Sequence, residues 1–205
     1  MNILWLVLSV LAWGLVHSIL AAHGTKALAS KLMGALADHF YRLLYNAFAV
    51  LSFVPVLILA ARTNSRVLYS VPLPWSALMV SGELLAILAL LVAFTETDVW
   101  EFLGFRQLGS VDEDHPPRLY TGGLYHYIRH PLYAAGLVFI WLLPIMTVNV
   151  LVVNISLTVY IVIGALFEEA KLRRQFGQAY VDYAAVTPML IPFTKWNKPP
   201  RNASM

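Results

Sequence analysis

The sequence predicts an all-α integral membrane protein. Of its 205 residues, 60% are hydrophobic and only 12% are charged, and the mean hydropathy is +0.70. This composition is typical of proteins whose helices lie in a bilayer. Five apolar segments are the predicted transmembrane helices: Ile3–Ala22, Phe40–Ala61, Leu73–Phe94, Leu132–Met146 and Val150–Phe167. The first three are each about 20 residues long, enough to cross a hydrocarbon core of roughly 30 Å at about 1.5 Å per residue.

The first apolar segment could be mistaken for a signal peptide, and the last two lie close together in the chain. The first begins at Ile3 without a basic stretch before it, and it is longer than the apolar core of a typical signal peptide, so we expect a retained helix. The fourth is short and ends near Pro144, and only Thr147-Val148-Asn149 separates it from the fifth. We therefore expect the last two segments to form a tight helical hairpin.

The basic residues predict the orientation of the chain in the membrane. If the C-terminus is cytoplasmic, all Lys and Arg residues fall on the inside except Arg62 and Arg66. Inside loops carry the excess of Lys and Arg in membrane proteins. The N-terminus is therefore expected outside and the C-terminus in the cytoplasm.

Several classes of function are not expected. Cysteine is absent, so there is no disulfide, no thiolate metal site and no Cys nucleophile. The six histidines are scattered and form no H-x-x-E-H or H-E-x-x-H pattern, so no metal is expected. The net charge of +3 is small and the basic residues lie beside membrane segments, which argues against nucleic acid as a partner.

Polar and charged residues are concentrated just before and just after the expected hairpin. The segment Gly123–Tyr133 precedes the hairpin and brings together aromatic, basic and proline residues, and the adjacent carboxylates Glu168 and Glu169 follow it. An aromatic belt with interfacial charges would explain any one of these residues, but it explains their combination less easily. A helix that begins at Pro131 would present free N–H groups to a carboxylate, and a glutamate would bind an amine. S-adenosylmethionine carries an amine, a carboxylate and an aromatic ring.

These motifs resemble the isoprenylcysteine carboxyl methyltransferase family, which includes membrane phospholipid methyltransferases and bacterial methanethiol S-methyltransferases. The resemblance covers roughly residues 100–193. It rests on Gly123-Leu124-Tyr125-x-x-x-Arg129-His130-Pro131-x-Tyr133, on Glu168-Glu169 and on Phe176-Gly177-x-x-Tyr180-x-x-Tyr183. The methanethiol branch is the most similar, on His17-Ser18, Tyr41-Arg42-Leu43-Leu44-Tyr45-Asn46, Phe102-x-Gly104-x-Arg106-Gln107 and Pro188-Met189-Leu190-Ile191-Pro192.

The resemblance implies an S-adenosylmethionine-dependent methyltransferase in a bacterial inner membrane, with S-adenosylhomocysteine as product. It implies one domain over residues 1–205, with a three-helix part at 1–95 and a cofactor-binding catalytic part at 96–205 whose loop and tail form the pocket. The cofactor-binding residues it implies are Gln107, Arg118, Leu119, Tyr120, Tyr125, His130, Pro131, Leu132, Tyr133 and Glu168. We expect Arg129, His130 and Glu169 to be catalytic, and His17, Tyr45 and Asn46 to contact the substrate.

The methyl acceptor is the open question. The prenylcysteine enzymes have a substrate-contacting Arg four residues before the first glutamate, where this chain has Gly164. That difference favours a small or lipophilic acceptor, and a thiol above all, which Arg129 or His130 could help to ionise. The alternatives are a prenylcysteine carboxylate, a phospholipid amine, or a non-enzymatic membrane protein with a respiratory or denitrification role. Membrane lipids are expected partners, and the sequence predicts no oligomeric state.

Overall fold

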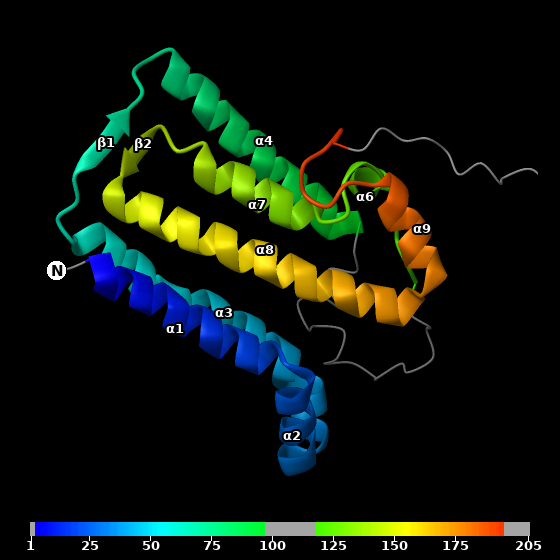
Figure 1. The fold of residues 1–205 in the computed structure, drawn as a ribbon. Coiled ribbons are helices and arrows are strands. Elements are labelled where there is room, and N and C mark those ends of the chain that lie inside the picture. Colours follow the sequence, from blue (N-terminus) through cyan, green and yellow to red (C-terminus); the bar gives the residue numbers. More distant parts are fainter. Residues whose placement is uncertain (1–2, 97–117, 195–205) are drawn as a thin grey trace, which may run out of the picture. The chain divides into compact units, whose positions relative to one another are not determined.

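The computed structural model describes residues 3–96 and 118–194, and their regular structure is almost entirely helical (Figure 1). Within these described residues, four helices are long and apolar enough to cross a membrane: Ile3–Ala21, His39–Arg62, Trp75–Glu96 and Val148–Phe176. A fifth apolar helix, Pro131–Trp141, is shorter. The predicted all-α membrane fold is confirmed. The chain divides into two compact units that alternate along the sequence, and the expected single domain with a boundary near residue 95 stays a prediction.

The first unit contains helices α1 (Ile3–Ala21), α2 (His23–Met33) and α3 (Ala35–Arg62) with the first part of α8 (Val148–Phe176). Helices α1 and α3 pack side by side, and α2 packs against both (Figure 1). The core of this unit is a cluster of buried aliphatic residues from three helices, namely Leu6, Val10, Val56 and Val153.

A small antiparallel sheet in the first unit is a feature that the sequence analysis did not predict. Strand β1 (Val67–Ser70) pairs with β2 (Ile145–Thr147), with an irregularity between Val67 and Tyr69. Next to it, the Asn149 amide donates to the carbonyls of Ala60 and Thr63, both at 3.0 Å. Ala60 is in the last turn of α3 and Thr63 is its C-cap residue, where backbone acceptors lack partners within the helix. Asn149 therefore ties the end of α3 to the start of α8.

The second unit contains α4 (Trp75–Glu96), α6 (Gly123–Tyr127), α7 (Pro131–Trp141), the second part of α8 and α9 (Gln178–Val186). Helices α4 and α7 pack together, and each has a buried alanine, Ala86 in α4 and Ala135 in α7. At Gly82 of α4, a Cβ atom would lie 2.6 Å from the Leu142 side chain. Small residues thus allow the two helices to approach closely.

The structure corrects the expected hairpin. The fourth predicted helix ends at Trp141 rather than Met146, and Thr147 is in β2 rather than in a turn. Pro144 cannot donate a helical hydrogen bond, and residues 145–147 pair with β1 instead. With 11 residues, α7 is about 16 Å long, shorter than a hydrocarbon core of roughly 30 Å. Its packing partner along its length is α4.

Candidate active site

The candidate site lies in the second unit, where the chain passes from α6 into α7. Pro131 is the first residue of α7, a position where its missing N–H costs nothing and its fixed φ suits the helix. The two residues before it are held by the C-terminal segment, because the Arg129 N–H donates to the Pro188 carbonyl at 2.9 Å and the His130 N–H to the Met189 carbonyl at 3.2 Å. The motif is thus fixed by its backbone as well as by its side chains.

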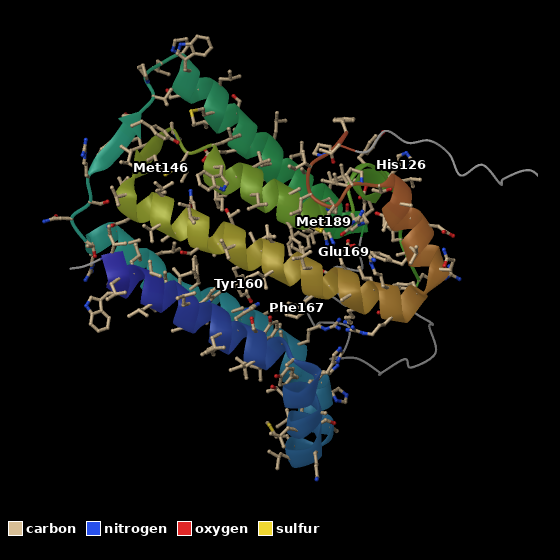
Figure 2. The ribbon with its side chains drawn as sticks, in the orientation of Figure 1. His126, Met146, Tyr160, Phe167, Glu169 and Met189 are labelled. Carbon is tan, nitrogen blue, oxygen red and sulfur yellow. The ribbon has the colours of Figure 1, made fainter. Side chains whose placement is uncertain are left out.

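Glu169 is the centre of a buried polar network (labelled in Figure 2). Its Oε1 atom accepts hydrogen bonds from Arg129 Nε at 2.7 Å and from the Tyr180 hydroxyl at 2.7 Å, and it lies 3.0 Å from His130 Nε2. Arg129 also donates to the carbonyls of Ala184 and Thr187. Arg129, His130 and Glu169 are each less than 10% exposed. A buried charge is tolerated only when it is paired and hydrogen-bonded, and here both conditions are met.

Glu168 precedes Glu169 in the chain but is in a different environment. Its side chain is 43% exposed, against 7% for that of Glu169. Its Oε2 atom accepts from the Tyr133 hydroxyl at 2.9 Å and lies 3.7 Å from His130 Nδ1. Successive helical residues point about 100° apart, so one carboxylate enters the network while the other stays accessible. Glu168 is therefore the carboxylate that is open to a ligand.

His130 connects the two carboxylates. Its Nε2 atom faces Glu169 and its Nδ1 atom faces Glu168, while its ring stacks on Tyr133 with centroids 5.4 Å apart and planes 16° apart. The ring is thereby held from three sides. Glu168 and Tyr133 are in turn placed by a histidine that cannot rotate freely.

Both glutamates lie well inside a helix. They were expected just after the fifth predicted helix, Val150–Phe167, but α8 continues to Phe176. The expected end of this helix was therefore wrong, and the two carboxylates lie more than one turn before its C-terminus. Phe167, just before them, is an apolar side chain that is 74% exposed (labelled in Figure 2).

Four tyrosines surround the motif. Tyr120 and Tyr125 meet edge to face at 5.7 Å, and the Tyr183 hydroxyl donates to the Tyr125 carbonyl at 2.5 Å. Burial, with a smaller effect of the Glu168 charge, raises the pKa of Tyr125 to about 12. Burial also raises the pKa of Tyr180 and of Tyr183. These phenols therefore remain protonated, and able to donate, near neutral pH.

Glu96, at the end of α4, was missed by the sequence analysis. Its carboxylate accepts the Leu124 N–H at 2.9 and 3.1 Å and so caps the short helix α6, which carries Tyr125. Gly123 has a φ of +51°, and a Cβ atom there would clash with the Glu96 carboxylate. The Gly122-Gly123 pair was the only sequence signal of this tight approach.

The structure brings together most of the predicted cofactor residues. Tyr125, His130, Pro131, Tyr133 and Glu168 are linked through the contacts above or through the α7 start, which also contains Leu132. Arg118, Leu119 and Tyr120 form the segment just before α6, and Tyr120 joins the site through Tyr125. Gln107 lies outside the described residues.

The predicted substrate residues belong to the first unit. The Tyr45 hydroxyl lies 2.6 Å from His17 Nε2, and Trp13 stacks on the His17 ring at 5.1 Å. Asn46 is the next residue of α3. Tyr160 of α8 (labelled in Figure 2) also contacts His17, ring to ring, and lies 3.2 Å from Ser18 Oγ. His17 and Tyr45 are thus hydrogen-bonded within an aromatic cluster, and contact with substrate stays a prediction.

The chain belongs to the family described as phospholipid methyltransferase, whose model matches residues 77–179, half of the chain. Among curated proteins it is similar to a methanethiol S-methyltransferase of Crocosphaera subtropica, with 37% identity over 97 residues that make up 46% of this chain and 38% of the relative. It is also similar to methanethiol S-methyltransferase 1 of Bradyrhizobium diazoefficiens, with 34% identity over 110 residues, 51% of this chain and 39% of the relative. A methanethiol S-methyltransferase of Pseudomonas deceptionensis is 34% identical over 113 residues, 53% of this chain and 42% of the relative.

The matched regions therefore span about two fifths of these relatives' own length. No solved structure matches the chain significantly. The predicted family membership is confirmed by the family model, which includes all of the residues from α6 to Glu169.

Proposed function

We propose that this protein is a membrane methyltransferase that uses S-adenosylmethionine and methylates a small or lipophilic acceptor, specifically a thiol. The observation that carries the proposal is the pair of adjacent glutamates in unlike environments, one buried in a network with Arg129 and one exposed beside Tyr133. Both lie inside the region matched by the family model. The choice of a thiol follows from the similar proteins, which are methanethiol S-methyltransferases.

The residues present suit the proposed cofactor. Glu168 offers an exposed carboxylate, oriented by Tyr133 and His130, to a positively charged amine. Tyr120 and Tyr125 form an edge-to-face aromatic pair that suits a purine ring. Glu168 thus suits the amine of S-adenosylmethionine and the tyrosine pair suits its ring, which are two of the three groups that a binding site must recognise.

In the proposed mechanism the chain mainly holds and orients its ligands. Glu168, Tyr120 and Tyr125 would hold S-adenosylmethionine, which when bound would supply the methyl group on a sulfonium for transfer to a thiolate, with S-adenosylhomocysteine as the leaving group. A free thiol has a pKa of about 8.5 and reacts as the thiolate after losing its proton to solvent. Because Arg129 and Glu169 are already paired with each other, we propose that they position His130 and the carboxylate of Glu168. Holding the reactants about 3–3.5 Å apart is the main source of rate in such a reaction.

We further propose that the N-terminus is outside and the C-terminus cytoplasmic, as the distribution of basic residues indicates. The expected compartment is a bacterial inner membrane. In that orientation the loop before α7 faces the cytoplasm, which is where a soluble cofactor is available.

The position of Gly164 supports a thiol over a prenylcysteine carboxylate. A Cβ atom at Gly164 would meet no atom within 4 Å among the described residues, so packing does not require glycine there. The prenylcysteine enzymes carry an arginine at this position, and this chain lacks it. Product analysis with labelled cofactor separates a methylated thiol from a methyl ester or a methylated lipid amine.

The test is calorimetric titration of S-adenosylhomocysteine into the protein in lipid nanodiscs. A charged hydrogen bond contributes about 1.5–3 kcal/mol, so Glu168→Ala is expected to weaken binding by roughly 10- to 150-fold. Arg174→Ala, an exposed change on the same helix, is the control and should bind as the wild type does. Undiminished binding by Glu168→Ala would refute the site assignment. Failure of the wild type to bind at all would favour a non-enzymatic membrane protein.

A further inference from the structure

Tyr125, one of the two rings proposed to bind the purine, lies on a helix that is too short to fix its own position. Helix α6 has five residues, whereas isolated helices shorter than about 12–15 residues are only marginally stable in water. Gly122 and Gly123 precede Tyr125 in the chain, and the backbone is extended again at Ile128. The position of Tyr125 therefore depends on contacts that other elements make with α6.

Glu96 holds the N-terminal end of α6 from the end of α4. Its two carboxylate oxygens accept the N–H of Leu124, the residue before Tyr125, at 3.1 and 2.9 Å. An N–H in the first turn of a helix has no acceptor within the helix, so the carboxylate supplies the partner that the backbone lacks. Gly123 allows this close approach, because a Cβ atom there would overlap the carboxylate.

Tyr183 holds the next residue of α6 from α9. Its hydroxyl donates to the Tyr125 carbonyl at 2.5 Å. Two consecutive residues of α6 are thus held by side chains 28 and 58 positions away in the chain. All of these residues belong to the second unit. The short helix is therefore fixed by hydrogen bonds to its backbone from two other helices of the same unit.

The Tyr125 side chain is near the other groups of the proposed site. Its ring meets that of Tyr120 edge to face at 5.7 Å. Burial raises the pKa of the Tyr125 phenol to about 12, with smaller effects of the Glu168 and Glu96 charges, so the phenol is within electrostatic reach of both carboxylates. The groups of a binding site need to be held to within about 0.5 Å by their supporting contacts. A displacement of α6 would therefore disturb the ring site.

We propose that Glu96 and Tyr183 are positioning residues for the adenine ring of the cofactor, which act by holding Tyr125 in place. This inference rests on the proposed function, since it takes Tyr125 as part of the cofactor site. It assigns the ring half of the ligand to α4, α6 and α9, and it leaves the amine half to Glu168 on α8. The two halves of the ligand should therefore respond to different substitutions.

Two ligands separate these halves in calorimetric titrations of the protein in nanodiscs. S-adenosylhomocysteine has the ring, the amine and the carboxylate, whereas 5′-methylthioadenosine has the ring but neither of the other two groups. Tyr183→Phe removes one neutral hydrogen bond and should weaken both ligands equally, by up to about 12-fold. Glu96→Ala removes a charged acceptor and should weaken both by up to about 150-fold. Glu168→Ala should weaken S-adenosylhomocysteine alone.

Matched variants separate positioning from a general loss of stability. Glu96→Gln keeps a side-chain oxygen that can accept from Leu124, so it should recover most of the affinity that Glu96→Ala loses. Tyr127→Phe removes a phenol oxygen from α6 at a residue that is 56% exposed, and it should bind both ligands as the wild type does. A purely structural role would lower the melting temperature but leave the affinity of the folded protein unchanged. If Glu96→Ala does not fold, Tyr183→Phe, which lacks a single oxygen atom, decides.

A measurement without ligand tests whether the two residues act through Tyr125. In protein that contains 3-fluorotyrosine, the fluorine resonance of Tyr125 is the one that is absent from Tyr125→Phe. This resonance should shift more in Glu96→Ala and in Tyr183→Phe than in Tyr127→Phe. Weakened binding with an unmoved resonance would mean that Glu96 or Tyr183 contacts the ligand directly, and it would overturn the positioning role.

The binding results also separate this inference from the proposed function. If the wild type binds S-adenosylhomocysteine but either Glu96→Ala or Tyr183→Phe loses less than twofold in affinity, the inference is overturned and the proposed function stands. Losses confined to S-adenosylhomocysteine would overturn it as well, because they would place the effect on the amine half. A wild type that binds neither ligand would refute the proposed function and this inference together.

Discussion

Replacing each of the two adjacent glutamates by alanine should have a different effect: Glu169→Ala should lower the stability of the protein, and Glu168→Ala should weaken ligand binding. Glu169 is buried and its Oε1 atom receives hydrogen bonds from Arg129 and Tyr180. Without it, the Arg129 guanidinium keeps two carbonyl acceptors but loses its counter-charge. Removing one partner of a buried ion pair costs about 3–5 kcal/mol. At about 2–4 °C per kcal/mol for a chain of this size, Glu169→Ala should lower the melting temperature by about 6–20 °C.

Glu168→Ala should change stability much less. The Glu168 side chain is 43% exposed, and its one short hydrogen bond is to the Tyr133 hydroxyl. A single hydrogen bond has a net contribution of about 1 kcal/mol, which corresponds to a fall of about 2–4 °C. Its loss should appear instead in the affinity for S-adenosylhomocysteine, as described for the proposed function.

Thermal unfolding in nanodiscs, followed by circular dichroism, measures the first effect, and calorimetry measures the second. Glu169→Gln keeps the size of the side chain and a hydrogen-bond acceptor but removes the charge, so it should lie between wild type and Glu169→Ala. A melting temperature for Glu169→Ala within about 2 °C of the wild type would refute the reasoning, because it would mean that Arg129 does not depend on this partner.

Two further predictions concern α6 and its surroundings. Gly123→Ala places a Cβ atom against the Glu96 carboxylate at a φ of +51°, and it should cost at least about 1–2 kcal/mol of stability. The control is Gly136→Ala in α7, where the new Cβ atom meets no described atom within 4 Å. The melting temperature of this control should be unchanged or raised. Tyr125 has its pKa raised to about 12 from about 10 in an unfolded chain, so the stability that depends on its neutral form is complete below about pH 10 and is lost as the pH rises toward 12. The melting temperature of Tyr125→Phe should therefore fall less between pH 10 and pH 12 than that of the wild type or of the control Tyr127→Phe. Equal falls would contradict burial as the cause of the raised pKa of Tyr125.

The residues of the candidate site could be located from the sequence, and their roles stay predictions, whereas the connections between helices could not be predicted from it. The motif from Gly123 to Tyr133 and the glutamate pair could be found because their residue types are uncommon beside apolar helices. Glu96 was missed because a lone acid at the end of an apolar helix is also what an ordinary membrane boundary looks like. Strand β2 was missed because Ile145-Met146-Thr147 is as apolar as the helices around it, and only its pairing with β1 distinguishes it.

The amino-acid sequence by itself determined that this is a helical membrane protein, where its long apolar helices lie, and which family its motif belongs to. Those properties depend on composition and on the local order of residues, which hydropathy and motif spacing record directly. Only the tertiary structure decided that α7 packs on α4, and that Glu169 is buried by residues 11 to 40 positions away while Glu168 stays exposed. The chain alone could not separate two identical neighbouring side chains, because their difference arises from which distant segments pack against each face of α8.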